Sequence, residues 1–181
     1  MINISSGSRT VENFGEGYGV EYTHYPLEDR IGMSVETAVS TFTEAAGLLQ
    51  QWVSEGRAVL VHCSAGLSRS ASMVMAWLIL SHGVDLSHAV ATFTAARGRQ
   101  PACTPSYWTA LMRLERLVLQ AGAGTPPTFD YTEWICDDVG GKGEEGRSSS
   151  LQLETDAQVA KLLRENHDWD ADAVFRSLMD G

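Results

Sequence analysis

The order of hydrophobic and polar positions predicts short strands and longer helices in the first part of the chain. Short runs rich in β-branched and aromatic residues, typical of buried strands, occupy residues 2–4, 22–25 and 58–61. Between the second and third runs, apolar residues recur at helical spacing from Val35 to Val53. The pattern therefore alternates between strand and helix.

The chain after the third strand repeats a helical pattern three times. Residues 69–82 are apolar on nearly all sides, which predicts a central, buried helix. The next helix begins at Asp85 or Ser87, and the last begins at Pro105 with Thr104 as its cap. Strands that alternate with helices predict an α/β fold, in which a central, mostly parallel sheet carries helices on both faces.

The turn between the third strand and the following helix carries the candidate chemistry. From residue 62 to residue 70 it consists of His-Cys-Ser-Ala-Gly-Leu-Ser-Arg-Ser. A loop of small residues before a helix presents unpaired backbone N–H groups, and the helix dipole favours negative charge there. The predicted phosphate loop consists of Ser64, Ala65, Gly66, Leu67, Ser68 and Arg69.

Cys63 stands at the focus of this predicted anion site. Positive surroundings of this kind lower the pKa of a thiol, so that the nucleophilic thiolate forms. Arg69 supplies a planar fork for two phosphate oxygens, and the Ser70 hydroxyl is placed to assist the sulfur when it leaves phosphorus. His62 is predicted to support the loop rather than to act as a base. The pattern indicates nucleophilic catalysis through a phosphocysteine, with Cys63, Arg69 and Ser70 as catalytic residues.

The string HC-x5-RS resembles the signature of the cysteine-dependent protein phosphatases, and its form here is similar to that of the dual-specificity phosphatases. The resemblance extends from about Ile2 to Leu119, and Arg97 and the helix begun by Pro105 resemble the family's last elements. It implies a fold like that of the protein tyrosine phosphatases. It also implies hydrolysis of phosphotyrosine and of phosphoserine or phosphothreonine, without a cofactor or a metal.

The segment Tyr25-Pro26-Leu27-Glu28-Asp29 resembles the part of the family that carries its general acid. Hydrolysis needs a group that protonates the leaving oxygen and then, as a base, activates water. The resemblance places Asp29 in this role, at the start of a loop that is placed to close over the pocket. Glu28 is the neighbour most easily confused with it.

The composition of the loop favours a phosphorylated protein as substrate. Relatives that act on inositol lipids tend to carry lysines inside the loop, whereas Ala65 and Leu67 are uncharged. Nothing in the chain resembles a kinase-docking domain, which fits a small, atypical member of the family. The family's usual first strand pair and short helix are not found before Ile2. Either the start of the chain is misassigned, or the chain is truncated and its sheet has one uncovered edge.

Two other interpretations remain open. A catalytically weak or inactive module would bind a phosphorylated partner or a ubiquitin-related protein without turning it over, as the missing first elements and the helical tail suggest. A sulfurtransferase or arsenate reductase would share a cysteine loop, but it would leave Asp29 and the Arg69-Ser70 pair less well explained.

Composition changes after the predicted catalytic domain, which spans residues 1–121. Residues 122–150 are rich in Gly, Pro and Ser and predict a linker, whose aromatic cluster at 128–135 either docks on that domain or forms a binding motif. Residues 151–181 predict an acidic helical hairpin. This stretch weakly resembles the ubiquitin-associated-like region of Ariadne-type ubiquitin ligases, which implies a ubiquitin-pathway partner. The alternative is a plain hairpin that packs against the phosphatase.

Charge and cysteine content narrow the setting of the protein. The net charge is −10, most of it contributed by residues 122–181, which argues against nucleic acid as a partner. No apolar run reaches the roughly 18 residues of a membrane span, and the N-terminus lacks the pattern of a secretion signal. The three cysteines do not suggest a disulfide framework. Because a reactive thiolate needs a reducing compartment, a cytoplasmic or nuclear location is predicted.

Overall fold

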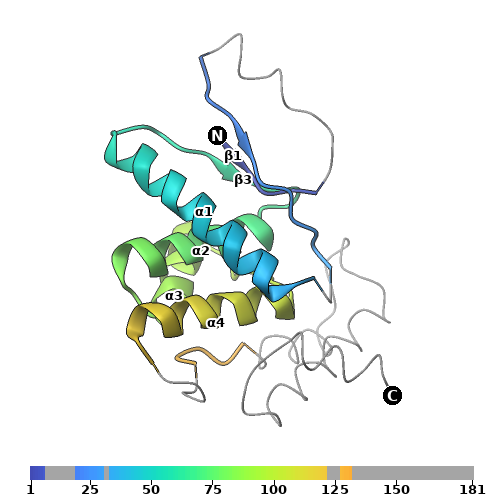
Figure 1. The fold of residues 1–181 in the computed structure, drawn as a ribbon, viewed down its shortest axis with the longest axis vertical. Coiled ribbons are helices and arrows are strands. Elements are labelled where there is room, and N and C mark those ends of the chain that lie inside the picture. Colours follow the sequence, from blue (N-terminus) through green and yellow to red (C-terminus); the bar gives the residue numbers. More distant parts are fainter. Residues whose placement is uncertain (7–18, 31–32, 122–126, 132–181) are drawn as a thin grey trace.

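The computed structural model describes residues 1–6, 19–30, 33–121 and 127–131 (Figure 1). This part of the chain forms three short strands and four helices, in the order predicted. They are β1 (Ile2–Asn3), β2 (Thr23–His24), α1 (Val35–Ser54), β3 (Val61–His62), α2 (Arg69–His82), α3 (Leu86–Arg97) and α4 (Pro105–Leu119). Each strand is shorter than its predicted run.

The described strands form one parallel sheet in the order β2-β1-β3. Ladder hydrogen bonds continue beyond the strand bounds, because the Ile2 N–H donates to the Leu60 carbonyl at 2.8 Å and the Ile4 N–H donates to the His62 carbonyl at 2.9 Å. The parallel α/β fold predicted from the sequence is confirmed. β3 lies at an edge of the described sheet, and the Leu60 side chain there is exposed.

α2 is the central element of the described fold. It packs against α1, α3, α4 and the end of β3, and Figure 1 shows it among the other three helices. Met73, Met75 and Ile79 are fully buried along it, which confirms the central helix predicted for residues 69–82. Since α2 begins at Arg69, its packing also fixes the arginine at the end of the preceding loop.

α1 and α4 both begin at their predicted N-terminal caps, but only the cap of α1 uses its side chain. The Ser34 hydroxyl accepts a hydrogen bond from the Thr37 N–H at 3.2 Å, as expected for a capping serine. Thr104 holds the cap position of α4, but its buried hydroxyl makes no hydrogen bond to the described residues. The predicted cap position is therefore confirmed, without a side-chain hydrogen bond. The Thr104 carbonyl accepts the Trp108 N–H at 3.1 Å, and Pro105 has no N–H that would need a partner.

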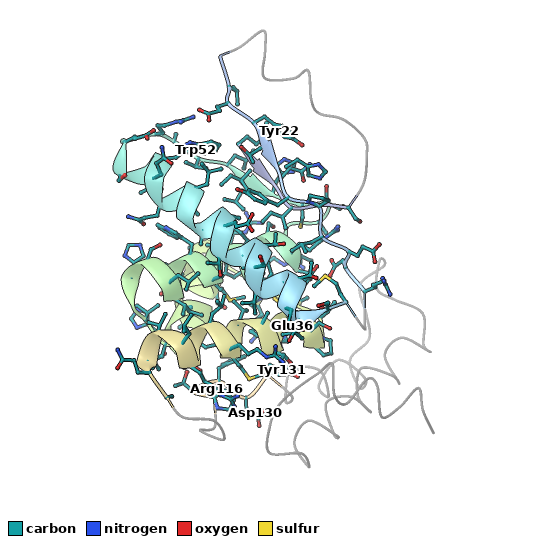
Figure 2. All side chains as sticks on the ribbon, viewed as in Figure 1. Tyr22, Glu36, Trp52, Arg116, Asp130 and Tyr131 are labelled. Carbon is teal, nitrogen blue, oxygen red and sulfur yellow. The ribbon has the colours of Figure 1, made fainter. Side chains whose placement is uncertain are left out.

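A short segment beyond α4, residues 127–131, docks on the folded core, and we call it the strap. The rings of Phe129 and Tyr131 lie against Trp108 of α4, with centroid distances of 5.3 and 5.5 Å. The Tyr131 and Trp108 rings are within 13° of parallel, and Tyr131 is fully buried beside α4 (Figure 2). Of the two interpretations left open for the aromatic cluster, its described part adopts the docked one.

The strap is also held by a buried carboxylate. Glu115 of α4 is 2% exposed, and it accepts hydrogen bonds from the Thr128 N–H at 3.3 Å and from the Thr128 hydroxyl. Each of the first three N–H groups of α3 has a side-chain acceptor: Leu86 with Glu115 at 2.7 Å, Ser87 with Thr128 at 3.1 Å and His88 with Asp85 at 2.7 Å. The strap therefore joins the start of α3 to α4, and Asp85 rather than Ser87 caps α3.

The predicted helical hairpin at residues 151–181 and most of the predicted linker lie outside the described residues. The boundaries predicted at residues 121 and 150 therefore stay predictions. In the described ranges, no helix combines the length and the hydropathy needed to cross a lipid bilayer.

Candidate active site

The phosphate loop connects β3 to α2, so it lies where a strand of the parallel sheet ends and a helix begins. Gly66 adopts a φ of 74°, a conformation that residues with a Cβ rarely adopt. The Ala102 N–H donates to the Leu67 carbonyl at 3.0 Å, which ties the loop to the segment before α4. Local sequence and a distant contact together fix the loop.

Cys63 is half-buried at the centre of this loop. Its Sγ lies 3.3 Å from the Ser70 hydroxyl and accepts the Gly66 N–H at 3.3 Å. Burial by itself raises the pKa of this thiol. The Ser70 hydroxyl and N–H, the Gly66 N–H and the positive charge of Arg69 together outweigh burial, and the pKa of Cys63 is lowered. The surroundings favour the nucleophilic thiolate.

Arg69 is 7% exposed, and contacts on three sides hold its guanidinium. Nη1 donates to the Leu27 carbonyl at 3.2 Å, and Nη2 donates to the Ser64 hydroxyl at 3.1 Å. Nε lies 3.4 Å from Oδ2 of Asp29, an ion-pair contact whose geometry is not that of a hydrogen bond. These contacts hold the guanidinium in place, and its positive charge lowers the pKa of Cys63.

Asp29 reaches the phosphate loop from the segment after β2. Its Oδ1 accepts a 2.6 Å hydrogen bond from the Ser68 hydroxyl, and its Oδ2 faces Arg69. Tyr107 of α4 donates to the Glu28 carbonyl at 2.6 Å and so anchors the backbone next to Asp29. The Glu28 side chain instead pairs with Arg30 at the surface. Of the two neighbouring carboxylates, only that of Asp29 contacts the loop.

His62 and Ala65, also predicted at the site, make fewer contacts there. His62 places Nδ1 3.4 Å from the Cys63 carbonyl, and its buried Nε2 has no hydrogen-bond partner among the described residues. The support predicted from its ring nitrogens is therefore limited to one long contact. Ala65 is exposed at the surface of the loop.

Cys103 lies behind the phosphate loop and has different surroundings. It is buried, its Sγ accepts a hydrogen bond from the Ser72 hydroxyl at 3.0 Å, and it lies 3.9 Å from the Ser68 carbonyl. Burial raises the pKa of its thiol to about 12, so the thiol stays protonated at neutral pH. Of the two cysteines described, Cys63 has the surroundings of a nucleophile. Cys136 lies outside the described residues.

Three contacts at the site were not predicted as such from the sequence. Ser68 was expected only as a loop residue, yet it binds Asp29. Tyr107 was not singled out, and Arg97 was noted only for its family resemblance. One Arg97 nitrogen, Nη2, lies 3.4 Å from the point where a Cβ on Gly66 would stand. These partners are far apart along the chain, and no local pattern marks such pairs.

The open parallel sheet, with a cysteine and arginine loop at the start of a central helix, is the arrangement of the protein tyrosine phosphatase fold. The family model described as "Dual specificity phosphatase, catalytic domain" matches residues 1–117. The chain belongs to the dual-specificity phosphatase family. The predicted family and fold are confirmed, whereas the Ariadne-like resemblance concerns residues beyond the match.

Curated relatives agree with this assignment. Mouse dual specificity protein phosphatase 2 is 34% identical over 121 residues, which cover 66% of this chain and 35% of that protein. Human dual specificity protein phosphatase 1 is 32% identical over 132 residues, which cover 70% and 33%. The chain thus spans about a third of the length of the curated relatives it matches.

Solved structures show the same fold. Human DUSP28 has a TM-score of 0.56 at 23% identity and covers 67% of this chain and 79% of its own. A structure of Tk-PTP in the active form has a TM-score of 0.54 at 29% identity and covers 64% and 76%. A structure of PTPMT1 in complex with PI(5)P has a TM-score of 0.56 at 23% identity and covers 66% and 77%.

Proposed function

We propose that this chain removes phosphate from phosphorylated proteins through a phosphocysteine formed on Cys63. The observation that carries the proposal is the sulfur itself, half-buried between the Gly66 N–H and the Ser70 hydroxyl, with its pKa lowered. The buried Arg69 guanidinium beside it supplies charge for the phosphate oxygens. Membership of the dual-specificity phosphatase family over residues 1–117 supports the same conclusion.

In the first step, the Cys63 thiolate attacks phosphorus and the bond from phosphorus to the leaving oxygen breaks. The leaving oxygen takes the electron pair of that bond and a proton from Asp29. The Asp29 carboxylate lies 3.4 Å from Arg69 Nε and so is close to the proposed phosphate site. In the proposed reaction, a phosphate oxygen takes the place of this carboxylate at Arg69, and Asp29 turns to the leaving oxygen.

In the second step, Asp29 takes a proton from water as the water oxygen attacks the phosphocysteine. The bond from phosphorus to sulfur breaks, inorganic phosphate forms and the sulfur recovers its negative charge. The Ser70 hydroxyl and the Gly66 N–H, both 3.3 Å from Sγ, stabilise that charge. The same contacts that ionise the free thiol therefore make it a better leaving group.

The substrate class proposed is phosphotyrosine together with phosphoserine or phosphothreonine in proteins. The uncharged Ala65 and Leu67 inside the loop support this class, as do the names of the curated relatives. An inositol phospholipid is the competing class, since PI(5)P is bound in one structure of the same fold. Its 23% identity supports the shared fold alone.

The proposal is tested with the purified protein and p-nitrophenyl phosphate. Cys63→Ser is expected to lower turnover by several orders of magnitude while phosphate binding is retained, because the loop N–H groups and Arg69 remain. Cys103→Ser is the matched control, and a folded Cys103→Ser protein should keep most of its activity. Comparable turnover by Cys63→Ser and the unmodified protein would exclude the mechanism. Phosphopeptides assayed beside a soluble inositol lipid then decide between the two substrate classes.

A further inference from the structure

The hydroxyl of Tyr107 links α4 to the segment that carries Asp29. Tyr107 is fully buried, and its ring lies against Phe42 of α1 with a centroid distance of 5.5 Å. Its hydroxyl donates to the Glu28 carbonyl at 2.6 Å. Burial raises the pKa of this phenol, and the nearby charge of Asp29 raises it further. The hydroxyl therefore keeps its proton and can act as a donor.

We call residues 25–29 the acid segment, and two neighbouring carbonyls in it accept hydrogen bonds from side chains. The Leu27 carbonyl accepts a hydrogen bond from Arg69 Nη1 at 3.2 Å, and the Glu28 carbonyl accepts the one from Tyr107. The next residue along the chain is Asp29. A shift of the Glu28 peptide would therefore move the Asp29 side chain with it.

The contact with Tyr107 differs from the contacts of the Asp29 side chain itself. In the proposed reaction, a phosphate oxygen displaces the Asp29 carboxylate from Arg69, so that this ion-pair contact is lost before the proton is transferred. The hydrogen bond from Tyr107 ends on a main-chain carbonyl and involves no group that the phosphate displaces. It can therefore hold the backbone while the carboxylate turns to the leaving oxygen.

We propose that Tyr107 is a positioning residue for proton transfer by Asp29. Its hydroxyl fixes the Glu28 peptide, so that the Asp29 carboxylate reaches the leaving oxygen once it has left Arg69. Tyr107 touches neither the substrate nor the sulfur, and it acts only through Asp29. This inference rests on the proposed reaction, with Asp29 as its acid.

The test is Tyr107→Phe, which removes the hydroxyl and keeps the ring that packs on Phe42. The readout is kcat/KM for phenyl phosphate, whose leaving group needs a proton, and for p-nitrophenyl phosphate, whose leaving group does not. A small displacement of a catalytic group costs up to about 10²-fold in rate, and we expect a loss of about tenfold with phenyl phosphate. The loss with p-nitrophenyl phosphate should stay below about threefold, because its departure depends less on Asp29.

Tyr22→Phe is the matched control. The Tyr22 hydroxyl accepts a hydrogen bond from Asn3 Nδ2 at 2.7 Å in the sheet, so the variant removes a tyrosine hydroxyl bond that does not reach the acid segment. It should keep both values of kcat/KM. Equal losses with the two substrates in Tyr107→Phe, or no loss, would refute the positioning role. A Tyr107→Phe protein that does not fold would also refute it, because the ring rather than the hydroxyl should stabilise the fold.

A double variant tests whether Tyr107 acts through Asp29. In the Asp29→Asn protein the acid is already absent, so adding Tyr107→Phe should leave the ratio of kcat/KM for the two substrates unchanged. A further fall of this ratio in the double variant would show that the hydroxyl acts on another group, and the inference would be wrong.

Hydrogen exchange separates this inference from the proposed reaction. Exchange of the acid segment, measured by mass spectrometry, should be faster in Tyr107→Phe than in the unmodified protein and unchanged in Tyr22→Phe. If the unmodified protein hydrolyses neither substrate but exchange still depends on Tyr107, the reaction is wrong and the hold on the acid segment stands. If Asp29→Asn selectively slows phenyl phosphate and Tyr107→Phe does not, the reaction stands and the role of Tyr107 is wrong.

Discussion

Replacing Ser70 by alanine should separate the two steps of the proposed reaction. Ser70 is 5% exposed, and its hydroxyl lies 3.3 Å from Cys63 Sγ. Burial acts to raise the pKa of Cys63, and the Ser70 hydroxyl is the largest of the contacts that lower it. Alanine fills the same place without the hydroxyl, while the Gly66 N–H and Arg69 remain. The pKa of Cys63 should therefore rise in Ser70→Ala.

The size of the kinetic effect follows from the contact that is lost. A hydrogen bond to a charged group contributes about 1.5–3 kcal/mol, and we take the lower bound because the distance is long and other donors remain. About 1.5 kcal/mol corresponds to roughly a tenfold change in rate. In the first step the sulfur gives up its charge, whereas in the second step it recovers it. The loss should therefore slow the breakdown of the phosphocysteine and spare the attack by an ionised Cys63.

The assay is rapid mixing with p-nitrophenyl phosphate at several pH values, which separates the ionisation of the thiol from its departure. The ratio of the phosphorylation rate constant to the dephosphorylation rate constant should rise about tenfold in Ser70→Ala. A burst of nitrophenolate should then grow towards one equivalent of enzyme. Acid-quenched samples should carry phosphate on the peptide that contains Cys63, as measured by mass spectrometry.

Ser72→Ala is the matched control on the same helix. The Ser72 hydroxyl donates to Cys103 at 3.0 Å, so the variant removes a hydroxyl contact from the other sulfur. It should leave the ratio of the two steps unchanged. A Ser70→Ala protein that slows both steps equally would refute the assignment of Ser70. An equal burst in Ser72→Ala would trace the effect to helix packing instead.

Three further predictions concern ionisation, proton transfer and the strap. Alkylation of Cys63 by iodoacetamide, followed by mass spectrometry, should have its pH midpoint below that of an ordinary thiol, whereas Cys103 should resist, because burial raises the pKa of its thiol to about 12. Folding lowers the pKa of Cys63, so its thiolate stabilises the fold at pH values above the pKa of this thiol in the unfolded chain. This stabilisation is lost as the pH falls through the pKa of Cys63 in the folded protein. An alkylation midpoint at or above that of an ordinary thiol would contradict this direction. Asp29→Asn should lower kcat/KM, which reports the first step, by roughly 10²–10⁴ for phenyl phosphate and by less for p-nitrophenyl phosphate, whose leaving group needs no proton; equal losses in kcat/KM would argue against an acid. Urea unfolding of Glu115→Gln, Thr128→Val and the double variant should give a coupling free energy of about 1 kcal/mol, and additivity within about 0.3 kcal/mol would contradict the strap contact.

The helices and the phosphate loop could be predicted because their signals are local. The loop occupies contiguous residues 62–70, and Gly83 and Gly98 end α2 and α3 where the sequence indicated. Thr104 also holds its predicted cap position, but its hydroxyl does not bind the helix. A capping residue signals where a helix begins, but tertiary packing decides where its side chain points.

The partners of Asp29 could not be predicted from spacing. By itself, an aspartate after a short strand is typical of a solvated turn, and only the family resemblance singled it out. Its contacts with Ser68 and Arg69 form when the segment after β2 crosses the start of α2. Tyr107 then fixes that segment from α4 through the Glu28 carbonyl. Such a site depends on tertiary contacts between distant segments, which periodicity does not encode.

The strap gives α3 a structural role that composition did not indicate. At its first turn, α3 is bound by Glu115 of α4 and by Thr128 of the strap, and at its last residue it presents Arg97 to the phosphate loop. A chain shortened to residue 121 would leave the Ser87 N–H without Thr128 and would expose the Trp108 ring that Tyr131 covers. A stretch predicted from its glycines and prolines to be a linker thus includes residues that hold α3, and α3 places Arg97 near Gly66 of the phosphate loop. Activity measured on a shortened chain therefore tests the site itself only if the strap is kept.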